Sequence, residues 1–192
     1  MLIKFYHDTG GDNWTHNDNW CSDKPIDEWY GVTYNGKTLY IYLYSNNLTG
    51  AGDLSGCTAL KRLACYKNQL SSLNVSDCTA LEKLYCYENH LTSLNVSGCT
   101  ALEWLWCNNN QLTSLNVSGC TALKWLDCKN NPITQQITAE LERLEKFYYD
   151  QRYAYSYFDR YWHYNYSDHH GWYYPNEPYS GYTYDGWDGT DN

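Results

Sequence analysis

One stretch of the chain repeats itself, and this repetition constrains the fold more than any other feature. From Leu60 to Ala122 the sequence runs LKRLACYKNQLSSLNVSDCTA, LEKLYCYENHLTSLNVSGCTA and LEWLWCNNNQLTSLNVSGCTA, with a period of 21 residues. A further unit begins at Leu123 as LKWLDCKNNPIT, and a more divergent one begins at Thr38 as TLYIYLYSNNLTG. One short unit cannot bury its apolar face alone, so a fixed period of this kind predicts a solenoid of stacked turns.

The template LxxLxCxxNxL inside each unit resembles the leucine-rich repeat family, and the resemblance covers residues 38–150. It implies an α/β fold: a right-handed horseshoe with a parallel concave sheet, a mostly non-helical convex side and caps at both ends. We therefore expect three parts. These are an N-terminal cap at 1–37, the solenoid at 38–150, and a Tyr/Trp-rich C-terminal cap or tail at 151–192.

Within each unit, strand alternation directs the fourth and sixth residues inward and the third, fifth and seventh outward. The ninth residue is an asparagine, whose side chain can bond the backbone of adjacent turns. The return segment LTSLNVSGCTA has no helical period, so we expect extended or 3₁₀ structure there. Continuing the frame past Leu126 predicts a last strand in KFYYD, preceded by an amphipathic helix in ITAELERLEK.

The N-terminal part has its own signals. LIKFYHDTGG predicts a short helix stopped by Gly10 and Gly11. The tryptophans that follow (Trp14, Trp20 and Trp29) are interpreted as core residues that cover the first turn, as in the cap of many bacterial and plant leucine-rich repeat proteins. Asn35-Gly36 lies between two strand-like runs and predicts a hairpin in which both residues have positive φ.

The chain has nine cysteines, a number that by itself suggests a disulfide network. Their positions in the repeat indicate otherwise. Eight of them form two columns of equivalent positions: Cys57, Cys78, Cys99 and Cys120, and Cys65, Cys86, Cys107 and Cys128. A column of equivalent residues has no reason to pair in twos, so we expect free, buried thiols that act as small hydrophobic groups. Cys21 stands outside the columns as a candidate free thiol, and the spacings match no common zinc pattern.

Charge and hydropathy exclude several kinds of partner. The net charge is -9, which argues against nucleic acid or an anionic membrane. No apolar run approaches the roughly 20 residues of a transmembrane helix, so no membrane insertion is expected. The first residues lack the pattern of a secretory signal and have instead the pattern of a short helix interior, which is compatible with a truncated start.

The outward positions of the expected strands carry an unusual number of aromatic residues, in a chain with 22 tyrosines and 9 tryptophans. The candidate ligand-binding residues are Tyr40, Tyr42, Tyr44, Tyr66, Tyr85, Tyr87, Trp104, Trp106, Trp125 and Asp127. Exposed aromatic clusters mark interaction surfaces, because Tyr and Trp give large contact areas at low entropic cost. We expect a non-enzymatic, monomeric recognition module that binds a protein through this face.

Alternatives remain at this point. Flat rings also stack on sugars, with Arg62, Lys83, Asp127 and Lys129 as polar groups beside them, so carbohydrate is the second candidate partner. A purely structural surface scaffold is the third, since the tail could fold over the face or the rings could only stabilise the sheet. A cell-surface or extracellular location is implied by the resemblance alone.

Enzymatic chemistry finds little support in the sequence. No Ser/His/Asp or Cys/His signature stands in a motif context, so we assign no catalytic residue and no cofactor. His163 with Asp168-His169-His170 is more typical of a solvated loop than of a metal site, and DGWDGTD lacks the spacing of an EF-hand loop. No metal site is therefore assigned.

Overall fold

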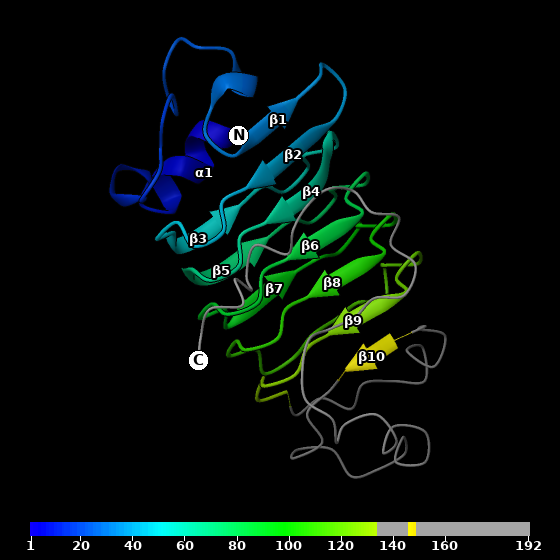
Figure 1. The fold of residues 1–192 in the computed structure, drawn as a ribbon. Helices are drawn as coiled ribbons and strands as arrows, with labels where there is room; N and C mark the ends of the chain where they lie inside the picture. Colours follow the sequence, from blue (N-terminus) through cyan, green and yellow to red (C-terminus); the bar gives the residue numbers. More distant parts are fainter. Residues whose placement is uncertain (134–145, 149–192) are drawn as a thin grey trace, which may run out of the picture. The chain divides into compact units, whose positions relative to one another are not determined.

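The computed structural model describes residues 1–133 and 146–148. In this part of the chain the structure is mostly strand, with one short α-helix (Figure 1). The helical elements are α1 (Leu2–Asp8) and the 3₁₀ helices η1 (Gly11–Asn13) and η2 (Ile26–Glu28). The strands are β1 (Val32–Tyr34), β2 (Leu39–Tyr42), β3 (Thr49–Asp53), β4 (Leu60–Ala64), β5 (Gln69–Asn74), β6 (Lys83–Tyr85), β7 (Ser93–Asn95), β8 (Trp104–Trp106), β9 (Trp125–Asp127) and β10 (Lys146–Tyr148).

The strands form two sheets, and from β2 to β8 the chain alternates between them. The larger has the order β1-β2-β4-β6-β8-β9-β10, and the smaller has the order β3-β5-β7 (Figure 1). All pairs are parallel except β1 with β2. The described chain is therefore a parallel β-solenoid, and the prediction of a parallel sheet is confirmed.

The repeat period is visible directly in the strand register. Leu63, Leu84, Leu105 and Leu126 are paired in succession at intervals of 21 residues, and Phe147 follows Leu126 by the same step. The first step differs, since Ile41 pairs with Leu63 after a register shift between Leu39 and Tyr40. The divergent first unit therefore enters the stack with one extra residue, which the sheet absorbs as an irregularity.

The return segments are extended, as the sequence predicts, and the stretch 91–100 contains β7 and no helix. The strands of the larger sheet are shorter than expected. Each turn bends away after the strand at a left-handed residue, at Ser45, Lys67, Glu88, Asn109 and Asn130, with φ between 49° and 54°. The helix expected in 137–146 lies outside the described residues up to 145, and Lys146 begins β10. The whole of 151–192 also lies outside the described residues.

Leucines fill the interior between the sheets. They recur at the first, fourth, eleventh and fourteenth positions of the units, and most are fully buried. The largest fully buried side chains include Leu60, Leu63, Leu70, Leu73, Leu81, Leu84 and Leu91. Burial of a side chain of this size contributes about 1.5–3 kcal/mol, so the stacked leucines supply the main driving force for folding.

The N-terminal segment lies beside the first turn, with α1 next to β3 (Figure 1). Trp14, Trp20 and Trp29 are each only 5–6% exposed, so their interpretation as core residues is confirmed. Their indole N–H groups donate to the backbone carbonyls of Thr9, Tyr30 and Lys24 respectively. Tryptophan suits these positions because its large apolar ring can be buried while its N–H group still makes a hydrogen bond.

The hairpin between β1 and β2 forms as expected, but its turn differs from the prediction. Gly36 has a φ of 85°, whereas Asn35 is not among the residues with positive φ. Instead, the Asn35 side-chain oxygen accepts from the backbone N–H groups of Lys37 and Thr38, at 3.1 and 2.8 Å. Asparagine thus stabilises this turn by side-chain capping, an alternative that its short amide always offers.

A ladder of buried asparagines joins successive turns, as the sequence predicts. It consists of Asn46, Asn68, Asn89, Asn110 and Asn131, defined here as the asparagine ladder. Asn89 is typical: its side-chain N–H₂ donates to the carbonyls of Cys65 and Cys86, at 3.0 and 3.1 Å, and its oxygen accepts from the N–H of Leu70 at 3.0 Å. Asn68, Asn89, Asn110 and Asn131 therefore each satisfy buried backbone groups in two adjacent turns.

The first member of the ladder has another role. Asn46 has no preceding repeat, and its side chain bonds the N-terminal segment instead: it accepts from the His16 N–H at 2.7 Å and donates to the His16 carbonyl at 2.8 Å. The same side-chain chemistry that joins one turn to the next thus attaches residues 1–34 to the stack.

All nine cysteines are free thiols, as predicted. Seven are buried, but Cys57 is only partly buried, which corrects the expectation for this member of its column. The reason is its position at the start of the stack. In the later turns the thiols of Cys78 and Cys99 donate to carbonyls of the preceding turn, at 3.1 and 3.0 Å, whereas Cys57 has no preceding turn of the same kind.

Replacing Asn89 with alanine should destabilise the fold by about 2–4 kcal/mol, because it leaves backbone groups of two turns buried without partners. Chemical denaturation of the two proteins measures the change. The matched control is Asn108→Ala, at an outward position of the following turn and only half-buried. Equal losses for both variants would contradict the special role of the ladder.

The buried thiols should resist modification until the chain unfolds. Burial raises the pKa of Cys65, Cys78 and Cys99 to about 12, so the reactive thiolate is scarce at neutral pH. In the native protein we expect fast reaction of exposed Cys21, slow reaction of Cys57 and none of the other seven. In denaturant without reductant all nine should react with a thiol reagent, and a lower number would show that disulfides are present.

Candidate functional site

The outer side of the larger sheet carries the predicted ligand-binding residues in rows that cross the strands. They are Tyr40, Tyr42, Tyr44, Tyr66, Tyr85, Tyr87, Trp104, Trp106, Trp125 and Asp127, and we call this set the aromatic face. All ten are half-buried. They lie together because neighbouring strands place equivalent repeat positions side by side.

The strand register defines two of the rows. One row runs through Tyr40, Arg62, Lys83, Trp104 and Trp125. The next row runs through Tyr42, Ala64, Tyr85, Trp106 and Asp127. Four successive positions of the first row thus place two cations next to two tryptophans, an arrangement that follows from the 21-residue period.

Three tyrosines just beyond the strands form a third row and stack on one another. The ring centroids of Tyr44 and Tyr66 are 4.9 Å apart with an interplanar angle of 5°, and those of Tyr66 and Tyr87 are 4.5 Å apart at 8°. Such a separation equals the spacing of neighbouring strands, about 4.8 Å. The solenoid geometry therefore imposes the stack, and tyrosine at the seventh position of consecutive units completes it.

The tryptophans continue the contacts toward the later turns. The rings of Trp104 and Trp125 stack at 4.7 Å with an angle of 12°, and Trp106 packs against Tyr85 at 4.8 Å with an angle of 45°. Lys83 places its Nζ 4.6 Å from the centroid of the Trp104 ring. This is a cation–π contact, which contributes about 0.5–1 kcal/mol at an exposed site. The sequence places Lys83 near the rings but does not reveal this contact.

Asp127 is the carboxylate of the aromatic face. Its Oδ1 accepts from the backbone N–H of Lys129 at 3.1 Å. Burial raises the pKa of Asp127 above its usual value, and the Lys129 N–H and charge only partly oppose this effect. The earlier turns have Ala64, Tyr85 and Trp106 at this position, so a charged group is the exception in its row.

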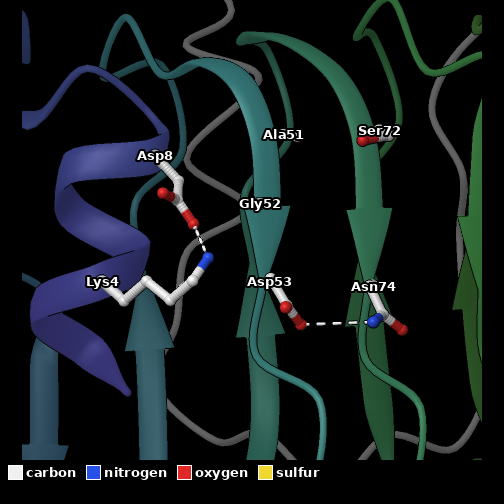
Figure 2. A pocket seen from close by; sticks show the side chains of 7 residues that line it. All are labelled: Lys4, Asp8, Ala51, Gly52, Asp53, Ser72 and Asn74. Carbon is white, nitrogen blue, oxygen red and sulfur yellow. Dashed lines mark hydrogen bonds and ion pairs between the residues drawn. The ribbon is translucent and has the colours of Figure 1, made fainter.

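A shallow pocket that the sequence does not predict lies between α1 and the smaller sheet (Figure 2). Its volume is about 460 Å³, and Lys4, Asp8, Asp53 and Asn74 are among its lining residues. The charged groups are already partnered: Lys4 pairs with Asp8, and Asp53 accepts from Asn74 at 3.2 Å.

The only sequence signal for this pocket is the run Gly50-Ala51-Gly52 in β3, where later repeats have larger residues. A Cβ at Gly52 would lie 2.9 Å from the ring of Phe5, and one at Gly50 would lie 2.6 Å from the carbonyl oxygen of Asp8. The small residues are therefore explained by the close approach of α1.

Metal binding and membrane insertion have no support in the part of the chain that the structure describes. There, no three His, Cys, Asp or Glu side chains come together as a metal site requires. Within the same ranges no helix has the length and apolar character needed to cross a bilayer. His163, Asp168, His169 and His170 lie outside the described residues.

The period, the two sheets and the stacked rings place the chain in a structural class, the parallel β-solenoids with 21-residue turns. Comparison with models of known protein families finds no family that matches, and no curated protein matches the sequence. The assignment of function therefore depends on the residues themselves.

Replacing Asp127 with asparagine should stabilise the protein at pH 7 and less so at pH 4. A carboxyl whose pKa is raised by folding favours the native state below its unfolded pKa and loses this contribution as the pH rises through the folded pKa. Asparagine keeps an oxygen for the Lys129 N–H without the charge. Thermal denaturation at both pH values measures the difference. A variant less stable than wild type at pH 7 would contradict the effect of burial on this carboxyl.

Proposed function

We propose that this chain is a leucine-rich repeat protein, capped at both ends, that acts as a non-enzymatic recognition module. Its aromatic face binds a protein partner at the cell surface or outside the cell. The observation that carries the proposal is the continuous series of ring contacts from Tyr44 to Trp125. Large aromatic side chains gathered on one sheet face are the residue types that dominate protein-binding hot spots.

The stacking itself favours recognition. Ring-on-ring contacts hold Tyr66, Trp104 and Trp106 in fixed orientations before any partner arrives. A preorganised side chain loses less conformational entropy on binding than a mobile one, for which the cost is about 0.5–1.5 kcal/mol. The aromatic face therefore combines large contact area with a low entropic cost.

Two other functions are considered beside this one. A glycan-binding surface is suggested by rings with polar neighbours such as Arg62 and Lys83. A purely structural scaffold is suggested because cross-strand stacking alone contributes about 0.5–1.5 kcal/mol per aromatic pair. Both alternatives are separated from protein binding by experiment.

Replacing Trp106 with alanine should weaken partner capture by about 30-fold, the equivalent of a hot spot of about 2 kcal/mol. The immobilised full-length chain is exposed to extracellular protein extracts, and retained proteins are quantified by mass spectrometry. A glycan array is probed with the same two proteins. Tyr30→Ala is the matched control, because Tyr30 is 37% exposed and belongs to the N-terminal segment.

The thermal stability of the variants distinguishes a binding role of the aromatic face from a purely structural one. Trp106 contacts Tyr85, Tyr87 and Trp104, so its loss costs some stacking energy but far less than Leu105→Ala, which empties a fully buried position. Retention of the same proteins by wild type and Trp106→Ala, together with a large loss of stability, would assign a structural role to the aromatic face. Retention of glycans instead of proteins would favour the second candidate.

A further inference from the structure

The hairpin turn between β1 and β2 contains a dipeptide with a chemistry of its own. Asn35-Gly36 is the one place in the sequence where a glycine follows an asparagine. Both residues are exposed, and a Cβ added to Gly36 would meet no atom within 4 Å. Because glycine has no side chain, the backbone nitrogen of Gly36 is less shielded than that of any other residue type.

The hydrogen bonds of this turn leave the two nitrogens beside the Asn35 side-chain carbon available. In the part of the chain that the structure describes, the Gly36 N–H donates no hydrogen bond, and the Nδ2 of Asn35 has no acceptor. The Oδ1 of Asn35, by contrast, accepts from the N–H groups of Lys37 and Thr38, at 3.1 and 2.8 Å. These two bonds draw electron density toward Oδ1 and so make the Cγ atom more electrophilic.

The same two donors are placed where negative charge would develop. If the Gly36 nitrogen attacks Cγ of Asn35, the carbonyl double bond opens and Oδ1 becomes an oxyanion. Backbone N–H groups already directed at such an oxygen stabilise a tetrahedral intermediate without reorganisation. The turn thus supplies Asn35 with an exposed nucleophile on one side and preorganised donors on the other.

We propose that Asn35 is a site of spontaneous covalent modification in the folded protein, with water as the co-reactant. The Gly36 nitrogen gives its proton to solvent and forms a bond to Cγ of Asn35. The bond from Cγ to Nδ2 breaks, and the amide nitrogen leaves as ammonia with a proton from water. Water then opens the resulting succinimide at either carbonyl, which yields aspartate or isoaspartate at position 35. The inference is independent of the proposed function.

Other asparagines of the described chain are less suited to this reaction. Those of the asparagine ladder are buried, and the Nδ2 that would have to leave is hydrogen-bonded, as Asn89 shows with the carbonyls of Cys65 and Cys86. Asn95 and Asn116 are exposed, but a valine follows each of them. Its branched side chain is stiff and shields the backbone nitrogen that would attack. The reaction is therefore selective for the hairpin turn.

The two products differ in their effect on the hairpin. Aspartate adds a negative charge and keeps an oxygen that can accept from Lys37 and Thr38. Isoaspartate instead carries the main chain through the former side chain, which lengthens the turn by a methylene group and removes this acceptor. Tyr34 pairs with Leu39 directly beside the turn. Isoaspartate should therefore loosen this end of the pairing between β1 and β2.

The test follows the full-length chain over time in mildly alkaline buffer, where circular dichroism verifies that it stays folded. Proteolytic peptides are separated and weighed by mass spectrometry. We expect the peptide that contains Asn35 to gain the mass that replaces –NH₂ by –OH and to split into two products of equal mass. Its conversion should be at least about tenfold faster than that of Asn95, where valine shields the nitrogen.

Variants connect the reaction to the geometry of the turn. Gly36→Ala should slow conversion of Asn35 by at least about tenfold, because a methyl group crowds the attacking nitrogen and disfavours the positive φ. The matched control is Gly56→Ala: Gly56 also has a positive φ, of 71°, and open space around it, but follows Ser55. This control should leave the rate at Asn35 unchanged.

Hydrogen exchange measures the consequence for the hairpin. The amides of β1 should exchange at the wild-type rate in Asn35→Asp, which keeps the acceptor oxygen, and faster in the purified isoaspartate form. Equal exchange in both forms would contradict the loosening of the hairpin by isoaspartate.

Each result of the time course supports or overturns the inference. An unmodified Asn35 in the folded protein, equal rates at Asn35 and Asn95, or equal effects of Gly36→Ala and Gly56→Ala would overturn it. Conversion that occurs only in denaturant would overturn it as well, because the reaction would then not belong to the folded turn.

Discussion

The structure depends on the satisfaction of backbone groups between successive turns. A solenoid turn buries carbonyl and N–H groups where its strand ends, and water cannot reach them there. The asparagine ladder solves this problem with one side chain per turn, which donates to two carbonyls and accepts from an N–H of the preceding turn. With each turn bonded to the next, the leucines stack in register, and the outer rows of side chains inherit the same spacing.

Much of the fold could be predicted because each position of the repeat recurs in several units, and every recurrence indicates the same burial and the same contacts. Leu84 and Cys86 have identical equivalents in three other units and Asn89 in four, so their burial and hydrogen bonding follow from the period. The turn at Asn35 and the partial exposure of Cys57 could not be read in this way. The first depends on a local competition between backbone conformation and side-chain capping, and the second on where the column begins.

For the aromatic face, the sequence predicts which residues lie on it but not how their side chains contact one another. Alternation along the strands places Tyr66, Tyr87 and Trp104 on one side of the sheet, and the structure brings them there. Which rings stack, at what angle, and which cation lies over Trp104 depends on side-chain rotamers, about which a periodic sequence carries little information. The pocket beside α1 was also not predictable, since it arises from how the helix approaches the glycines of β3.

The series of rings has an optical consequence. Adjacent centroids from Tyr44 through Tyr66, Tyr87, Trp106 and Trp104 to Trp125 are separated by no more than 6.4 Å. At such distances excited states of neighbouring chromophores couple, and energy absorbed by the tyrosines passes to the indoles. The nearly parallel Trp104 and Trp125 rings should interact as an exciton pair. The sheet face therefore carries its own intrinsic chromophore, whose circular dichroism and emission depend on the alignment of the turns.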